Sequence, residues 1–163
     1  MPDPSAPAIV ITSVGADQLE AIMAIMRASF SDQYGEAWTE EQCASTFPLP
    51  HYEWRLARRN DVAVGFMLIR SVMTESELML LAVVPAQRER GVGTALITSW
   101  VASCTERGVD ELHLEVRSGN PAIQLYQSRG FVTVSTRANY YPVRDGVRHD
   151  ALTMKKSLGL IPI

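Results

Sequence analysis

The sequence predicts a mixed α/β domain built on a central sheet, and two patterns support this prediction. Short apolar or alternating runs typical of strands interleave with longer stretches whose apolar residues recur at the helical period of about 3.6. The length of 163 residues also fits one domain that buries its own core without metals or disulfides. We therefore expect one domain over residues 8–158, with a flexible leader at 1–7 and a tail at 159–163.

The first third of the chain predicts one strand and two helices. A β-branched run at residues 8–14 is typical of a strand. From Asp17 onward, apolar residues fall on one face of a helix that reaches about Phe30. A polar loop at 31–38 separates this helix from a second, shorter one that ends near residue 47.

The second helix has a clear start signal. Residues 39–42 read TEEQ, which matches a capping box. In that motif the Thr39 side chain accepts the backbone N–H of Gln42, and the Gln42 side chain reaches back to the N–H of Thr39. Proline at position 48 ends the helix, because it cannot continue the hydrogen-bond pattern.

The middle of the chain predicts three consecutive strands. Residues 52–58 and 62–73 form a hairpin around a short polar turn. A second turn at 74–75 leads to a nearly continuous apolar strand at 77–84. A strand of this composition is typical of the centre of a sheet, with both faces covered.

The last third predicts a helix, a strand, a second helix and a final pair of strands. Their expected ranges are 91–107, 111–117, 121–129, 131–137 and 148–155, with a long turn at 142–146. In the strand at 111–117 the apolar residues share one face, and the other face has the polar side chains His113, Glu115 and Arg117.

Composition argues against several classes of protein: nucleic-acid-binding, membrane-spanning, secreted and metal-binding. Fifteen Lys and Arg against eighteen Asp and Glu give a net charge of −3, which argues against a nucleic-acid-binding protein. No apolar run approaches the roughly 20 residues of a membrane span, and the N-terminus does not resemble a signal peptide. Cys43 and Cys104 form no CxxC pattern and the three histidines have no ligand spacing, so we expect a cytoplasmic protein with reduced cysteines and no metal.

The most informative stretch is the turn within residues 84–94, where an apolar strand ends and a helix begins. Backbone N–H groups at a helix start bind anions, and Gly91 and Gly93 let a phosphate approach the backbone closely. Arg88 and Arg90 add positive charge. The alternative is a tight turn that needs glycine for its geometry alone. The stretch matches neither the P-loop nor the dinucleotide-binding fingerprint.

Two motifs resemble the GNAT superfamily of N-acetyltransferases. Arg88-x-x-Gly91-x-Gly93 resembles its acyl-CoA motif, and NPAIQLYQSRGF at 120–131 resembles its N-x-x-A-x-x-L-Y-x-x-x-G-F helix, one residue shorter between Asn120 and Tyr126. The resemblance implies a single GNAT-type domain whose mixed, mostly antiparallel sheet has about seven strands and about four flanking helices. It also implies acetyl-CoA as co-substrate.

A narrower resemblance points to one branch of that family. LEVR at 114–117, RANYYP at 137–142, DA at 150–151 and AWT at 37–39 resemble the RimI type, which acetylates the N-terminal alanine of a small-subunit ribosomal protein. The second arginine of that branch's RRNYYP motif is Ala138 here. The resemblance implies a protein or peptide partner with a free N-terminus, in particular a basic ribosomal protein.

The family match also implies two catalytic roles. Glu115 would be the base that takes a proton from the acceptor amine, and Tyr126 the acid that protonates the leaving sulfur. A phenol of pKa about 10 can protonate a thiolate whose conjugate acid has a pKa of about 8.5. From the residues alone, Glu115 is equally a surface carboxylate paired with Arg117 or His113, and Tyr126 equally a core aromatic.

The resemblance further implies a set of binding residues. The backbone of Leu81, Ala82 and Val83 would hold the pantetheine arm. The pyrophosphate would be held by the turn and helix start: Arg88, Glu89, Arg90, Gly91, Val92, Gly93 and Thr94. Asn120 and Tyr126 complete the acetyl-CoA side. Tyr140 and Tyr141 would wall the acceptor side, where Trp38 either shapes the groove or anchors the loop before the second helix.

Other functions remain open on the sequence alone. The same fold could acetylate a small-molecule amine or a lysine side chain, or bind acyl-CoA without catalysis. Charge distribution favours a cationic acceptor, because residues 29–53 contain five carboxylates and no Lys or Arg. These carboxylates are Asp32, Glu36, Glu40, Glu41 and Glu53.

Overall fold

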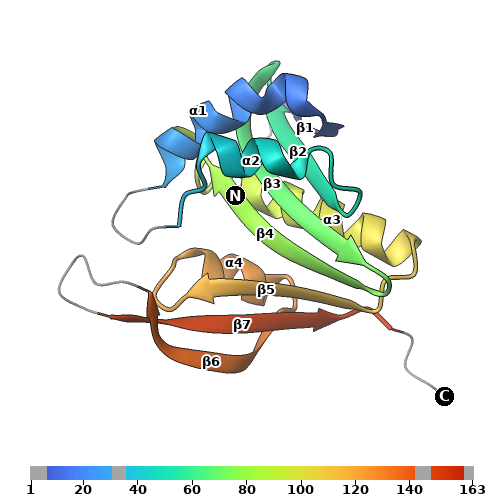
Figure 1. Cartoon of the computed structure of the whole chain (residues 1–163), viewed down its shortest axis with the longest axis vertical. Coiled ribbons are helices and arrows are strands. Elements are labelled where there is room, and N and C mark those ends of the chain that lie inside the picture. The colour runs from blue at the N-terminus through green and yellow to red at the C-terminus, as the bar shows by residue number, and fades with distance from the viewer. Residues whose placement is uncertain (1–6, 31–35, 142–147, 160–163) are drawn as a thin grey trace.

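The computed structural model describes residues 7–30, 36–141 and 148–159 of the chain. It contains one seven-stranded sheet with the order β1-β2-β3-β4-β5-β7-β6 (Figure 1). The strands are β1 (Ile9–Val14), β2 (Tyr52–Arg59), β3 (Val62–Val72), β4 (Glu75–Val83), β5 (Glu111–Arg117), β6 (Val132–Tyr141) and β7 (His149–Ser157). The helices are α1 (Leu19–Ser29), α2 (Glu40–Thr46), α3 (Val92–Glu106) and α4 (Ala122–Ser128), with short 3-10 turns η1 (Ala16–Gln18) and η3 (Pro85–Gln87).

The sheet is mixed, and only the β4–β5 pair is parallel among its described neighbours. This confirms the predicted mostly antiparallel sheet. Helices α1 and α2 cover one face over β2, β3 and β4, and α3 and α4 cover the other (Figure 1). No described helix covers β5, β7 and β6 on the face of α1 and α2, so polar side chains of those strands are accessible there.

Each face of the sheet has its own core. On the α1 and α2 side the fully buried residues include Trp54, Phe66 and Met26. On the α3 and α4 side they include Trp100 and Phe131, whose rings stack with centroids 5.8 Å apart. Cys43 lies in the first core and Cys104 in the second, and both are free and buried, as predicted.

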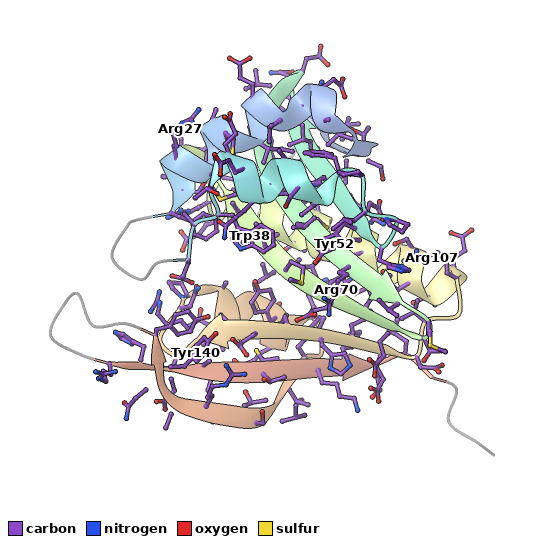
Figure 2. The ribbon with its side chains drawn as sticks, viewed as in Figure 1. Arg27, Trp38, Tyr52, Arg70, Arg107 and Tyr140 are labelled. Atoms are coloured by element: carbon purple, nitrogen blue, oxygen red, sulfur yellow. The ribbon has the colours of Figure 1, made fainter. Side chains whose placement is uncertain are left out.

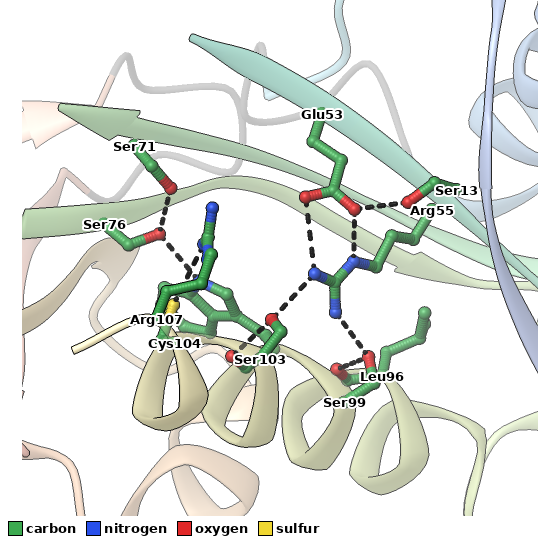
Figure 3. A network of polar contacts seen from close by, with 11 residues as sticks. Ser13, Glu53, Arg55, Ser71, Ser76, Leu96, Ser99, Ser103, Cys104 and Arg107 are labelled. Carbon is green, nitrogen blue, oxygen red and sulfur yellow. Dashed lines mark hydrogen bonds and ion pairs between the residues drawn. The ribbon is translucent and has the colours of Figure 1, made fainter. Parts of the chain in front are cut away.

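A polar network ties β2 to α3 (Figure 3). Arg55, buried on the α3 side of β2, donates to Glu53 at 2.8 and 3.3 Å. It also donates to Ser99 at 3.1 Å and to Ser103 at 2.8 Å on α3. Ser13 of β1 donates to the same Glu53 carboxylate. The network therefore joins β1, β2 and α3 through one carboxylate and one guanidinium.

The local signals of the second helix are confirmed. The Gln42 N–H donates to Thr39 Oγ1 at 3.1 Å, and the Thr39 N–H donates to Gln42 Oε1 at 2.8 Å, which completes the predicted capping box. The cap fixes where the chain enters α2, and with it the position of Trp38 immediately before the cap.

The predicted turn at 74–75 is wrong, because β4 already begins at Glu75. The chain reverses at Met73, which adopts a left-handed φ of 55° that its residue type does not signal. Strands β6 and β7 also extend further than predicted at their C-terminal ends, β6 to Tyr141 and β7 to Ser157. The predicted turn at 142–146 lies outside the described residues, as do nearly all of the predicted leader at 1–7 and tail at 159–163.

An irregularity in β4 separates it from β5. Leu68 pairs with Leu80 and Ile69 pairs with Leu78, so Met79 is an extra residue that bulges from the strand. The parallel pairing with β5 covers Glu75–Leu78 and Glu111–Leu114 only, and beyond it β5 pairs with β7 alone. The two central strands thus diverge at the ends where β4 reaches the turn at residues 84–91, called the phosphate turn below after its predicted role, and β5 reaches α4.

Candidate active site

A cavity of about 690 Å³ lies where β4 and β5 diverge. Its walls include residues 78–81 of β4 and 114–116 of β5. Seven residues predicted as site residues line this cavity. Leu81 was predicted to act through its backbone, and the other six are Trp38, Glu115, Asn120, Tyr126, Tyr140 and Tyr141. In Figure 2, Trp38 lies on the side of α2 and Tyr140 on the side of β6, so the two borders of the cavity come from opposite ends of the chain.

Glu115 is held by a partner that the sequence did not suggest. Its carboxylate lies 3.7 Å from the Arg137 guanidinium of β6 and is 34% exposed. The guanidinium in turn lies over the Tyr140 ring, 4.3 Å from its centroid. The two partners considered from the sequence are engaged elsewhere, Arg117 with Glu36 and His113 with carboxylates further along the sheet. Glu115 therefore faces the cavity with one exposed cation beside it.

Tyr126 is both a core residue and a wall of the cavity. Its side chain is 6% exposed and packs edge-on against Phe131 with ring centroids 6.2 Å apart. Burial, and then the negative charge of Glu36, raises the pKa of the Tyr126 phenol above its ordinary value. The phenol consequently keeps its proton at neutral pH, as a proton donor must.

The two tyrosines of β6 differ in their surroundings. Tyr140 is 49% exposed, and its ring meets that of Tyr141 edge-on at 5.3 Å. Tyr141 is half-buried, and burial, followed by the charges of Glu36 and Glu115, raises its pKa to about 12. The pKa of Tyr141 therefore depends on two carboxylates, Glu36 in the segment before α2 and Glu115 on β5.

A largely buried ion pair between Glu36 and Arg117, which no sequence motif indicated, lies at the cavity. Glu36 approaches the Arg117 guanidinium at 3.4 Å, and the two side chains are only 20% and 10% exposed. Glu36 lines the cavity beside Tyr126. The available signals were weak, because Glu36 was one of five acids in residues 29–53 and Arg117 one of four polar residues on its strand.

The phosphate turn has the features expected of an anion site. Gly91 caps α3 with a left-handed φ of 87°, and a Cβ there would meet nothing within 4 Å. Ala95 makes the first intrahelical bond, to the Gly91 carbonyl, so the N–H groups of residues 92–94 have no acceptor within the helix. Gly93 also serves packing, because a Cβ there would lie 2.9 Å from the Leu125 side chain of α4. Glu89 is exposed with a φ of 61°.

The two arginines of this turn take part in hydrogen bonds of different kinds, Arg88 through its side chain and Arg90 through its backbone carbonyl. Arg88 donates to the carbonyl of Val83 at 3.1 Å and of Ser29 at 2.8 Å, which joins the turn to the end of α1. The Arg90 carbonyl accepts a bond of 3.0 Å from Arg59. Arg88 therefore contributes charge near the turn while its donors are used within the chain.

Three buried polar atoms around the turn lack hydrogen-bond partners among the described residues. They are Ser29 Oγ, Arg59 Nε and Gln87 Oε1. Burying such atoms without partners costs free energy. Ser29 Oγ and Arg59 Nε can donate to an anion, whereas Gln87 Oε1 can only accept a hydrogen bond. Asn120 uses its side-chain oxygen to accept the Ala122 N–H at 2.9 Å, which caps α4 at the cavity wall.

Outside the cavity, one cluster has metal-ligand chemistry. Ligand atoms of Glu75, Glu111 and His113 lie within 4.8 Å of one another. Lys155 contacts the Glu111 carboxylate at 2.5 Å and so already supplies a positive charge there. Among the described helices, none is both long and apolar enough to cross a membrane.

Comparison with known proteins agrees with this fold. The model of the acetyltransferase (GNAT) family matches residues 19–131, and the chain belongs to this family of acetyltransferases. The ribosomal protein bS18-alanine N-acetyltransferase of Escherichia coli K12 is 37% identical over 118 residues, which cover 72% of this chain and 78% of that protein.

Two solved structures extend the comparison. The crystal structure of the ribosomal-protein-S18-alanine N-acetyltransferase from E. coli superposes with a TM-score of 0.86 at 31% identity, covering 95% of this chain and 97% of that one. The PaiA N-acetyltransferase of Thermoplasma acidophilum, solved in complex with coenzyme A, shares the fold with a TM-score of 0.76 at 18% identity, covering 92% and 99%.

Proposed function

We propose that this protein transfers an acetyl group from acetyl-CoA to the N-terminal α-amine of a protein, namely an N-terminal alanine on a small-subunit ribosomal protein. The main support is the similarity to the E. coli bS18-alanine N-acetyltransferase over most of both chains. Ribosomal proteins are made in the cytoplasm, where we place the reaction.

The phosphate turn is the proposed binding site for the pyrophosphate. The free N–H groups at the start of α3 and the left-handed Gly91 provide donors for an anion. At its diverging end β4 still pairs with β3 but has no strand partner on its β5 side, so backbone groups of Leu81 and Ala82 that face this side are proposed to hold the pantetheine arm. Acetyl-CoA supplies the acetyl group as an activated thioester.

Glu115 and Tyr126 are the proposed proton-transfer groups. Glu115 takes a proton from the acceptor amine as the amine attacks, and its exposure lets it pass that proton to solvent. The Tyr126 hydroxyl gives a proton to the leaving sulfur. The ring is fixed against Phe131 and largely excluded from water, so the hydroxyl has a defined position.

The chemistry of the base favours an α-amine over a lysine. An α-amine has a pKa of about 7.8 and a lysine about 10.4, so the α-amine is neutral roughly several hundred times more often at neutral pH. A single carboxylate is an adequate base for the first and a poor one for the second.

A competition among acceptors tests this proposal. The protein and acetyl-CoA are incubated with a basic peptide that begins with alanine, the same peptide with a blocked N-terminus and one internal lysine, and a panel of small amines. We expect acetylation of the first peptide only, measured by mass spectrometry. Acetylation of only the lysine or the small amines would reject the proposal.

A further inference from the structure

Three carboxylates line the cavity, and Glu36 is the most enclosed of them. Its side chain is 20% exposed, against 34% for Glu115 and 39% for Glu77. Glu77 pairs with Arg70 at 3.3 Å, and Arg70 is itself 44% exposed. Among these three carboxylates, only Glu36 is paired with a buried cation, Arg117.

The ion pair leaves part of the Glu36 carboxylate available. Arg117 Nε reaches one oxygen at 3.4 Å, a long single contact, and Arg117 also donates to the Ser118 carbonyl at 3.3 Å. No contact among the described residues engages the second Glu36 oxygen. Arg117 thus fixes the position of the carboxylate without using all of its acceptor capacity.

Glu36 also lies close to the groups that would perform the reaction. Its negative charge acts on the phenols of both Tyr126 and Tyr141, and Tyr141 responds to Glu115 as well. A charge affects a neighbouring group in this way only over a short distance. Glu36, Glu115, Tyr126 and Tyr141 all line the same cavity, so an acceptor amine that reaches one carboxylate there is also near the other.

We propose that Glu36 is the binding site for the positively charged ammonium form of the acceptor's N-terminus. The proposal rests on the proposed function and specifies how that site selects a primary ammonium group. The two carboxylates then have different tasks. Glu36, held by buried Arg117, binds the ammonium. Glu115, beside an exposed arginine, takes the proton that the ammonium loses to become the neutral amine, passes it to solvent, and then takes the second proton released as the amine attacks. Acetylation removes the positive charge, so the product loses this contact and leaves more readily.

The test is a binding cycle that needs no turnover. Titration calorimetry in the presence of coenzyme A measures the affinity of an alanine-terminated peptide and of its N-acetylated form for the parent and for Glu36→Gln. A charged hydrogen bond of this kind predicts that the parent prefers the free amine by about tenfold, and that the preference falls below about twofold in Glu36→Gln.

The matched control is Glu106→Gln, which removes the same charge from an exposed position at the end of α3 on the other face of the sheet. It should keep the parent's preference. Glu36→Asp keeps the charge on a shorter side chain and should keep part of the preference, which separates loss of charge from loss of folding. A parent without preference, or Glu36→Gln with the parent's preference, would overturn the inference.

The same samples separate this inference from the proposed function. If the parent binds the amine preferentially through Glu36 but acetylates no N-terminal alanine, the proposed function fails and the ammonium site stands. If the parent acetylates the peptide and Glu36→Gln keeps the full binding preference, the function stands and the ammonium site fails.

Discussion

The two halves of the active site are built in different ways. The half assigned to acetyl-CoA consists mainly of backbone from one continuous stretch, in which β4 ends, the turn follows and α3 begins. The half assigned to the acceptor consists of side chains from segments far apart, such as Glu36 and Arg117, which are 81 positions apart in the sequence. A binding site for a cofactor that a whole family shares can be built from one short motif in the chain. A binding site for a particular acceptor needs side chains that can change from one family member to another without altering that motif.

The largest effect is expected at the acceptor half, from Glu115→Gln. The amide has the same shape but cannot take a proton, so kcat should fall by about a hundredfold to a thousandfold. Coenzyme A affinity measured by calorimetry should stay within about twofold, because the change leaves the phosphate turn intact. Equal rates for variant and parent from about pH 6 to pH 9 would remove Glu115 from the role of base.

Tyr126→Phe should have the next largest effect. The ring still packs against Phe131, so the fold and coenzyme A binding should survive, while kcat falls by about tenfold to a hundredfold through loss of the proton donor. Steady-state kinetics with the alanine-terminated peptide measure the fall. An unchanged kcat would move the acid role to another group, for which Tyr140 and Tyr141 are the candidates.

A substitution in the half assigned to acetyl-CoA should weaken coenzyme A binding and leave kcat nearly unchanged. Gly91→Ala forces an alanine into a left-handed conformation that costs about 1 kcal/mol, and it disturbs the N–H groups that follow. We expect coenzyme A to bind about fivefold to tenfold more weakly, with kcat at saturating acetyl-CoA close to that of the parent. Undiminished affinity would mean that the turn needs this glycine for its own geometry alone.

The smallest effect is expected outside the active site, in the Glu53–Arg55 network that joins β2 to α3, and it concerns the pH dependence of stability. Burial works against ionisation of Glu53, but hydrogen bonds from Arg55 and Ser13 outweigh it, so the pKa of this carboxyl lies below its ordinary value. Its ionised form therefore stabilises the fold above the unfolded-state pKa, and this contribution is lost as the pH falls through the lower folded-state pKa.

Thermal unfolding between about pH 7 and pH 3 tests this network, since unperturbed carboxyl groups titrate near pH 4. The parent should lose a few degrees more in Tm over that range than Glu53→Gln, which has no carboxyl to protonate. Parallel curves for the two proteins would show that the network contributes nothing to the pH dependence.

The same contrast explains how much the sequence could reveal. The capping box at Thr39, the alternation that places Glu115 on the polar face of β5, and the glycine turn before α3 are all local patterns, and the structure contains each of them. The left-handed turn at Met73 has no residue signal, so the start of β4 was misplaced. The Met79 bulge, which opens the cavity, depends on how three strands pair and has no local pattern either.

Long-range ion pairs are the other feature that the sequence did not predict. The alternative interpretation of Glu115, as a surface carboxylate, paired it with Arg117 or His113 on its own strand, but its partner is Arg137 on β6. Glu36 was visible only as one acid among five. Charge patterns along a chain report which groups are available, and only the fold decides which of them meet.

The central claim is that the acceptor is the N-terminal alanine of a ribosomal protein, and one measurement tests it directly. Small-subunit ribosomal proteins that lack N-terminal acetylation are incubated with this protein and acetyl-CoA and analysed by intact-mass and peptide mass spectrometry. The claim predicts that one basic protein beginning with alanine gains the mass of a single acetyl group on its N-terminus. Acetyl groups found only on lysine side chains, or on no ribosomal protein at all, would contradict it.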